Sequence, residues 1–253
     1  MNAAPRAVAA PPAVTALNEG GASRFFLLCE HASNVIPAEY AALGLPAAEL
    51  ERHIAYDIGA AKLARRLSGL LDAPLFLAGA SRLLIDLNRP WRAPSSIPEV
   101  SEATVIPGNI GIDAAERARR QAAWFTPFHD RVAAFLATRT GAVVIGVHSF
   151  TPVYLNAVRP WHAGILYGQA ERFGTGLVRA LAEDPALVIG DNEPYRIELE
   201  YDYTVPVHGD AAGRVAVLLE VRQDLLGDDA GCAAWAQRLA AALSTARGAA
   251  ARG

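Results

Sequence analysis

Cysteine and lysine are nearly absent from this sequence of 253 residues. It has two cysteines, Cys29 and Cys232, and a single lysine, Lys62. Two cysteines cannot form a disulfide scaffold, although the sequence does not exclude one disulfide between them. No Cys-x-x-Cys motif for zinc or redox chemistry is present. We therefore expect a protein of a reducing, cytoplasmic compartment that folds around a hydrophobic core.

A strong charge of either sign is also missing. The formal net charge is −3 and the isoelectric point is about 6.1. This balance disfavours a partner that is a nucleic acid or a membrane surface. No segment approaches about 18 uninterrupted apolar residues, so the sequence predicts no membrane-spanning helix.

Both ends of the chain lack the features of folded or targeting segments. Residues 1–21 are mainly Ala, Pro and Val, with Arg6 as the one basic residue, and their prolines interrupt the apolar run that a secretory signal needs. We expect residues 1–21 to be a disordered tail and residues 247–253 to fray. One α/β hydrolase domain over residues 22–246 is expected between them.

Short apolar runs alternate with longer helical patterns along this domain. The composition, 52% hydrophobic and 19% charged, is that of a globular protein. The alternation predicts a three-layer α/β sandwich around a mixed, mostly parallel central sheet. The expected strands are 25–29, 74–77, 83–87, 142–147, 164–167 and 215–221, and the expected helices are 59–71, 113–138, 169–183 and 229–245.

Polar side chains gather where these strands end. Glu30 and His31 follow the first strand, His148 follows a later one, and Glu220 ends another. The segment with Asp86, Asn88 and Arg89 follows the expected strand near residue 85. Any one of these residues alone is explained as a helix cap or as a polar side chain whose hydrogen bonds are made within the protein. Because chemistry collects at the carboxyl ends of parallel strands, the conjunction indicates a functional site.

Two histidines from different strands suggest a metal site. Catalytic zinc takes about three protein ligands and water, so His31 and His148 need a third ligand. Asp57, His53 and Glu30 are the candidates, and the residues alone leave the choice open. Three arginines near the same strand ends indicate an anionic substrate: Arg82, Arg89 and Arg222. The motifs of zincins, serine hydrolases and dinucleotide- or nucleotide-binding proteins are missing.

Taken together, the ordered motifs make the chain resemble the N-formylglutamate amidohydrolase family from about residue 25 to residue 243. The matching stretches are Cys29-Glu30-His31-Ala32-Ser33, His53-Ile54-Ala55-Tyr56-Asp57-Ile58-Gly59-Ala60, Ser81-Arg82-Leu83-Leu84-Ile85-Asp86-Leu87-Asn88-Arg89-Pro90, Ile106-Pro107-Gly108-Asn109, Pro127-Phe128-His129, His148-Ser149-Phe150-Thr151-Pro152, Asn192-Glu193-Pro194-Tyr195, His208-Gly209 and Glu220-Val221-Arg222-Gln223-Asp224-Leu225.

The resemblance implies a fold like that of zinc carboxypeptidases and a hydrolytic Zn²⁺ site. His31 and His148 then fit metal ligands, with Asp57 as the third, because Asn34 stands where the carboxypeptidase pattern has an acidic ligand. Other divalent metals also suit such a site. The remaining roles implied or suggested are a general base (Glu220), a carbonyl-polarising group (Arg82), a substrate-carboxylate site (Asn88, Arg89) and further substrate contacts (Arg222, His208).

The expected reaction is therefore hydrolysis of the N-acyl amide of an acidic amino acid. N-formylglutamate, cleaved to formate and glutamate in histidine catabolism, is the first candidate, so the expected partner is a small anionic amino-acid derivative. The sequence Glu30-His31-Ala32-Ser33 replaces the Pro-His-Ser-Gly of deformylating members, which indicates a distinct branch. The alternatives are hydrolysis of other N-acyl amino acids or peptides, and a non-catalytic binding protein. A homodimer is possible.

Overall fold

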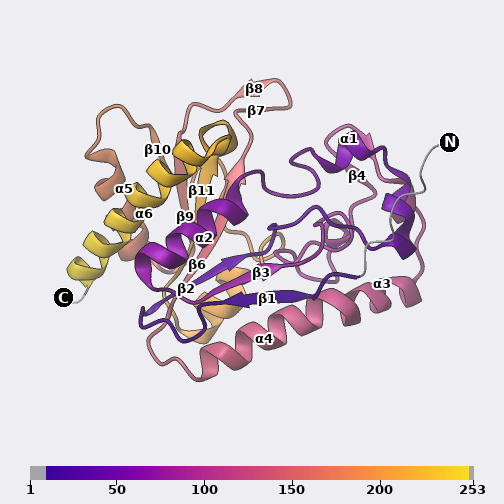
Figure 1. Cartoon of the computed structure of the whole chain (residues 1–253), viewed down its shortest axis with the longest axis horizontal. Helices are drawn as coiled ribbons and strands as arrows, with labels where there is room; N and C mark the ends of the chain where they lie inside the picture. Colours follow the sequence, from indigo (N-terminus) through magenta and orange to yellow (C-terminus); the bar gives the residue numbers. More distant parts are fainter. Residues whose placement is uncertain (1–9, 251–253) are drawn as a thin grey trace.

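A seven-stranded sheet lies at the centre of the protein in the order β1-β3-β2-β6-β11-β9-β10 (Figure 1). The structure is a computed structural model that describes residues 10–250, with side chains up to residue 246. Strands β3, β2, β6 and β11 run parallel to one another, β1 and β9 pair antiparallel with β3 and β11, and β10 is parallel to β9. The strands are β1 (Val14–Leu17), β2 (Phe25–Cys29), β3 (Leu75–Ala78), β6 (Val143–Phe150), β9 (Ala163–Tyr167), β10 (Ile189–Asp191) and β11 (Ala216–Arg222).

Helices cover both faces of this sheet. One face packs against α2, α5 and α6, and the other against α4 and the loops that precede and follow it. The helices are α1 (Ala47–Leu50), α2 (Ala60–Leu71), α3 (Ala114–Arg120), α4 (Thr126–Ala137), α5 (Glu171–Ala182) and α6 (Asp229–Ala250). Two short hairpins lie outside the sheet: β4 (Val100–Ser101) with β5 (Thr104–Val105), and β7 (Val153–Tyr154) with β8 (Ala157–Val158). The predicted three-layer sandwich with a mixed, mostly parallel sheet is confirmed.

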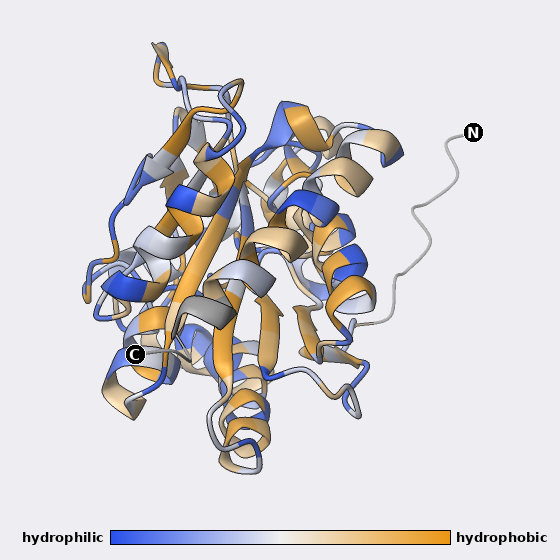
Figure 2. Cartoon of the chain, turned by 90° about the vertical axis from the view of Figure 1, so that its left-hand side faces the viewer, coloured by the Kyte–Doolittle hydropathy of each residue, from blue (hydrophilic) through white to orange (hydrophobic). Residues whose placement is uncertain are grey.

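The central strands are buried on both faces, which explains their unbroken apolar sequences. Every residue of β2 and β6 is buried, and Figure 2 shows the apolar colour on the strands between the helices. In the register of β11 with β6, Glu220 lies beside His148. Two ionisable side chains therefore enter the same region from neighbouring strands.

Helix α2 begins directly after the segment that carries Asp57. Gly59 has a left-handed φ of 83°, and a Cβ atom there would lie 2.5 Å from Leu226 Cβ. Only glycine allows this turn at so close an approach. Leu63, Ala64 and Leu67 then bury one face of the helix on the sheet. Asp57 is therefore fixed between the sheet and a well-packed helix.

The long helix predicted over residues 113–138 is present as α3, a π-helical turn (Gln121–Phe125) and α4 in succession (Figure 1). Asp113 caps it, because its side chain accepts a hydrogen bond from the backbone N–H of Glu116 at 2.8 Å. Phe128, Val132 and Leu136 bury its inner face on the sheet.

Three sequence predictions are wrong. Part of the tail predicted to be disordered forms strand β1, which pairs with the edge strand β3; residues 1–9 lie outside the described residues. Helix α6 continues to Ala250, beyond its predicted end at residue 245; residues 251–253 lie outside the described residues, and fraying of the C-terminus stays a prediction. Residues 83–87 form turns and not a strand.

Two further observations concern the chain as a whole. Cys29 and Cys232 are both free and buried, so they form no disulfide. In the part of the chain that the structure describes, no helix combines the length and the apolar character that crossing a membrane requires.

Candidate active site

A cavity of about 630 Å³ opens at the carboxyl ends of β6 and β11. Its volume falls in the range of roughly 300–1,000 Å³ that is typical of small-molecule sites. Seven of the side chains predicted to form the site line it: His31, Asp57, Arg82, Asn88, Arg89, His148 and Glu220. The strand ends thus converge as the sequence indicated.

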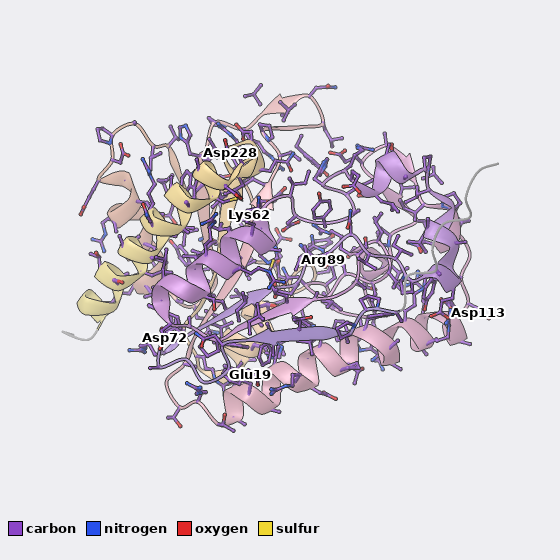
Figure 3. The ribbon with its side chains drawn as sticks, in the orientation of Figure 1. Glu19, Lys62, Asp72, Arg89, Asp113 and Asp228 are labelled. Carbon is purple, nitrogen blue, oxygen red and sulfur yellow. The ribbon has the colours of Figure 1, made fainter. Side chains whose placement is uncertain are left out.

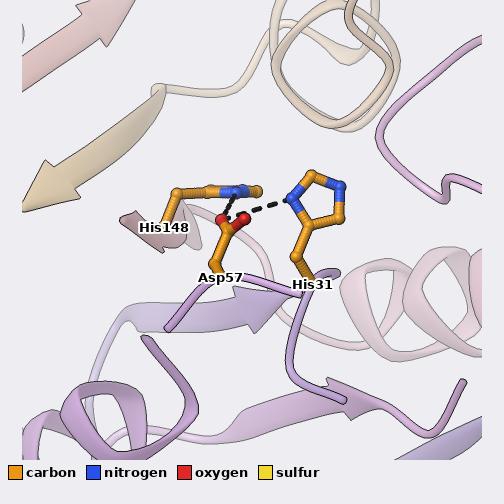
Figure 4. A group of neighbouring side chains, drawn as sticks. All are labelled: His31, Asp57 and His148. Carbon is orange, nitrogen blue, oxygen red and sulfur yellow. Dashed lines mark hydrogen bonds and ion pairs between the residues drawn. The ribbon is translucent and has the colours of Figure 1, made fainter. Parts of the chain in front are cut away.

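Two histidines and an aspartate form a tight cluster at the base of the cavity (Figure 4). Asp57 Oδ2 lies 3.2 Å from His31 Nδ1 and 2.9 Å from His148 Nδ1. One ligand atom from each residue lies within 4.8 Å of the other two, and all three residues are buried. The backbone supports this arrangement, because the N–H of Asp57 donates to the carbonyl of His31 at 3.0 Å.

The far nitrogens of both imidazoles also face carboxylates. His31 Nε2 donates to Asp86 Oδ1 at 2.8 Å, and His148 Nε2 lies 3.2 Å from Glu30 Oε2. Carboxylates at this position orient imidazole rings whose other nitrogen binds a metal. Asp86 and Glu30 therefore direct the two Nδ1 atoms toward Asp57.

Proton counting shows that this cluster suits a cation. A neutral imidazole has one N–H group, whereas each ring here faces a carboxylate with both nitrogens. Either each ring carries a second proton, or a cation lies between the Nδ1 atoms and Asp57. Burial disfavours the charged imidazoles, but the neighbouring carboxylates outweigh it and raise the pKa of His31 and of His148. A divalent metal satisfies the same carboxylates with neutral rings.

The two alternative third ligands lie elsewhere. Burial opposes ionisation of Glu30, but His148 and the Thr204 hydroxyl, which donates to Glu30, lower its pKa to about 2. Glu30 faces the far nitrogen of His148 and not the shared centre. His53 lines the cavity, where its Nε2 lies 3.0 Å from Glu102. Of the three candidates, Asp57 is the one that the geometry joins to both histidines.

Glu220 is a buried carboxylate with one oxygen left unbonded in the described part of the chain. Its Oε2 makes no hydrogen bond within the described part of the chain. Burial raises its pKa to about 7, with Asp57 adding to the effect and His148 opposing it. A carboxylate poised near neutral pH beside a possible metal site has the properties of a general base.

Arg82 stands between two carboxylates of the same site. It lies 3.2 Å from Asp57 Oδ1 and 2.7 Å from Asp86 Oδ2, and its side chain is partly exposed to the cavity. The hydrogen bonds to Asp57 and Asp86 use three of the five N–H groups of Arg82. Arg82 therefore keeps donors for a substrate oxygen.

Comparisons with known proteins identify the family of the chain. The family model for N-formylglutamate amidohydrolase matches residues 23–227. The chain belongs to the N-formylglutamate amidohydrolase family. No functionally curated protein matches the sequence.

Two solved structures resemble this family member along nearly their whole length. The gene product Atu2144 of Agrobacterium tumefaciens has 38% sequence identity and a TM-score of 0.92, with 95% of this chain and 96% of that chain covered. The N-formylglutamate amidohydrolase of Ralstonia eutropha JMP134 has 20% identity and a TM-score of 0.63, with 94% and 97% covered. The second likeness concerns the fold alone.

In this member of the N-formylglutamate amidohydrolase family, Asn88 and Arg89 face a carboxylate of the protein itself. Asn88 Nδ2 donates to Asp202 Oδ1 at 3.3 Å, and Arg89 Nη1 lies 3.7 Å from the same oxygen. Figure 3 shows Arg89 among the loops to the right of helix α2. Both residues line the cavity as predicted. A substrate carboxylate that bound them would have to compete with the carboxylate of Asp202.

Arg222 and His208 lie outside the cavity, so we leave both out of the proposed substrate site. Arg222, the last residue of β11, pairs with Asp224 at 2.8 Å. His208 is buried, and its Nε2 lies 2.9 Å from His129 Nδ1. Because His129 Nε2 donates to the Leu87 carbonyl at 2.8 Å, His208 is the donor in the pair. Burial lowers the pKa of His129 to about 3 and that of His208 to about 4.

The structure adds residues that sequence reasoning missed. Asp202 lines the cavity, as does Tyr195, whose ring packs on the Arg159 guanidinium at 4.7 Å. Burial and Glu220 raise the pKa of Tyr195 to about 12, so its hydroxyl stays protonated. The Asn-Glu-Pro-Tyr motif contained a signal for Tyr195. Nothing in the sequence near Asp202 indicated its position.

Proposed function

We propose that the protein is a metal-dependent amidohydrolase that cleaves the N-acyl bond of an amino-acid derivative. N-formylglutamate, which would give formate and glutamate, is the first candidate substrate because of the family. The observation that supports the proposal most is the convergence of His31, Asp57, His148 and Glu220 on one cavity. A non-catalytic binding protein would not need, beside such a cluster, a buried carboxylate oxygen like Glu220 Oε2, which makes no hydrogen bond within the described residues.

His31 Nδ1, His148 Nδ1 and a carboxylate oxygen of Asp57 would hold the metal. A zinc ion, when bound, supplies Lewis-acid activation of the amide carbonyl and of water. Two-histidine, one-carboxylate sites also accept Mn²⁺, Fe²⁺ and Co²⁺, so zinc is the first ion to test.

The chain supplies the proton transfers and the charge stabilisation. Glu220 accepts a proton from the attacking water, a C–O bond forms, and the C–N bond breaks as Glu220 returns the proton to the leaving nitrogen. Arg82 donates hydrogen bonds to the oxygen on which negative charge develops. A well-placed donor of this kind contributes roughly 3–4 kcal/mol to the transition state.

The size of the cavity favours a second group of substrates. A volume of about 630 Å³ suits a molecule larger than N-formylglutamate. Larger N-acyl amino acids and short acylated peptides are therefore the second candidates, with the same bond cleaved by the same residues.

The proposal is tested by hydrolysis assays on protein loaded with zinc. Release of formate from N-formyl amino acids is measured beside release of amine from longer N-acyl amino acids. Zinc-dependent hydrolysis of any member of the panel is the expected result. Binding of the panel without hydrolysis, at full zinc occupancy, would favour the binding protein.

A further inference from the structure

Asp202 places a negative charge against the residues expected to recognise a substrate carboxylate. It is 9% exposed and lines the cavity. Its Oδ1 faces Asn88 and Arg89, at 3.3 and 3.7 Å. Its Oδ2 accepts a hydrogen bond from the backbone N–H of Glu198 at 3.0 Å. Both carboxylate oxygens thus have partners within the protein.

The backbone after Asp202 is fixed at two points. Asn88 Oδ1 accepts the backbone N–H groups of Tyr203 and Thr204 at 3.2 and 3.0 Å. The Thr204 hydroxyl in turn donates to the buried Glu30. Asn88 therefore holds this segment with three hydrogen bonds, and displacement of Asp202 by a substrate would disturb the anchor of the segment.

Carboxylates of the protein already neutralise the charges of Arg82 and Arg89. Arg82 lies between Asp57 and Asp86, and Arg89 faces Asp202. Arg196 also lines the cavity, but it is exposed, so solvent screens its charge. A substrate carboxylate that approached Arg89 would meet the carboxylate of Asp202, and close like charges at a binding surface are strongly unfavourable.

We infer that the substrate side chain reaches Arg89 and that Asp202 is a specificity-determining residue, which bars a side-chain carboxylate from Arg89 and selects a neutral, hydrogen-bond-donating group there. A carboxamide meets this requirement, because its NH₂ group can donate to Asp202 Oδ1. The preferred substrates are therefore N-acyl derivatives of glutamine-like amino acids and not of glutamate. The inference rests on the proposed amidohydrolase function and narrows its substrate class.

The test compares N-formylglutamine with N-formylglutamate, which differ in one carboxamide. We expect the zinc-loaded wild type to favour N-formylglutamine at least about tenfold in kcat/KM, a difference of about 1.4 kcal/mol. Asp202→Asn removes the opposing charge and should lower this preference at least about tenfold. Glu200→Gln is the matched control, because it removes one exposed charge from the same loop at a residue that does not line the cavity.

A double variant shows whether the effect acts through Arg89. If Asp202→Asn frees Arg89 for the substrate carboxylate, Arg89→Met in the same chain should abolish the gain on N-formylglutamate. Asp202→Ser also lacks the charge. It is used as the test variant if Asp202→Asn melts at a lower temperature than the wild type. A wild-type preference for N-formylglutamate, or a ratio that changes less than about twofold in both Asp202 variants, would overturn the inference.

A binding measurement separates failure of this inference from failure of the proposed function. Titration calorimetry of N-acetylglutamine and N-acetylglutamate is made on zinc-loaded Glu220→Gln, with and without Asp202→Asn. If no member of the substrate panel is hydrolysed but the predicted binding preference and its loss are found, the hydrolytic function fails and the role of Asp202 stands. Equal hydrolysis of both compounds by the wild type contradicts the role of Asp202 alone.

Discussion

Replacing Glu220 by glutamine should remove turnover and stabilise the protein at the same time. The substitution keeps the shape of the side chain but removes a buried carboxylate that has no hydrogen-bond partner at Oε2 within the described residues. As the proposed base, Glu220 accounts for roughly a 10²- to 10⁴-fold rate effect, which should be lost from kcat. Metal content should not change, because Glu220 is not among the proposed ligands.

The stability effect follows from the raised pKa of Glu220. In the unfolded chain a glutamate titrates near 4.5, whereas in the folded protein burial raises the pKa to about 7. Folded protein therefore binds more protons between these values, so this side chain lowers stability as the pH rises from 4.5 through 7. The difference corresponds to about 3 kcal/mol. Glutamine does not titrate, so Glu220→Gln should be about 3 kcal/mol more stable than the wild type above pH 8 and no more stable below pH 4.5.

The two effects are measured on metal-free and on zinc-loaded protein. Urea unfolding of metal-free wild type and variant across this pH range gives the stability difference, in which the titrations of groups that do not interact with Glu220 cancel. Zinc-loaded protein gives kcat. A near-normal kcat would refute the assignment of the base. A stability difference that does not vary with pH would refute the argument that Glu220 is a desolvated carboxylate.

Two further predictions concern residues inside and outside the cavity. Arg82→Met should lower kcat/KM for the best substrate at least about 100-fold, whereas Arg222→Met should change it less than about twofold, because Arg222 pairs with Asp224 outside the cavity; equal losses in steady-state assays would contradict these placements. His208 has a pKa of about 4 when folded and an ordinary value of 6.5, so the unfolded chain binds more protons in this window and the wild type should lose stability as the pH falls from 6.5 to 4. His208→Gln, which can still donate to His129, should weaken that loss in urea unfolding; an unchanged pH dependence would show that His208 is not the group responsible.

The sequence predicted the convergence of the site because the side chains lie at strand ends. His31, His148 and Glu220 follow or end buried apolar runs that form β2, β6 and β11, and parallel order brings these ends to one edge. Asp57 could be named only as one of three candidates. Its position depends on the turn at Gly59 and on packing of α2 against the sheet, which local spacing does not encode.

The wrong strand at residues 83–87 has a clear physical origin. Leu83, Leu84 and Ile85 are fully buried, so their apolar run reports burial and not strand pairing. Side chains from distant segments take the place of a neighbouring strand: the Leu83 carbonyl accepts from Asn109, and that of Leu84 accepts from Arg120. A pattern of hydrophobicity does not reveal such partners.

Non-local pairing explains the remaining differences. Strand β1 owes its existence to the free edge of β3, a partner about 60 residues away that composition could not indicate. His208 was predicted at the substrate from its polar, glycine-containing surroundings, but its partner is His129 on α4. Asp202 contacts Asn88 from a loop for which the sequence indicated only that it is long and polar, so this contact could not be predicted.

Metal dependence is the most direct test of the account as a whole. Protein stripped with a chelator is reloaded with zinc, and metal content and hydrolysis of N-formylglutamine and N-formylglutamate are measured together, with His148→Ala as the matched variant. We predict about one zinc ion per chain, hydrolysis only in the loaded wild type, and loss of both in the variant. Full hydrolysis by metal-free protein, or zinc binding that His148→Ala leaves unchanged, would contradict it.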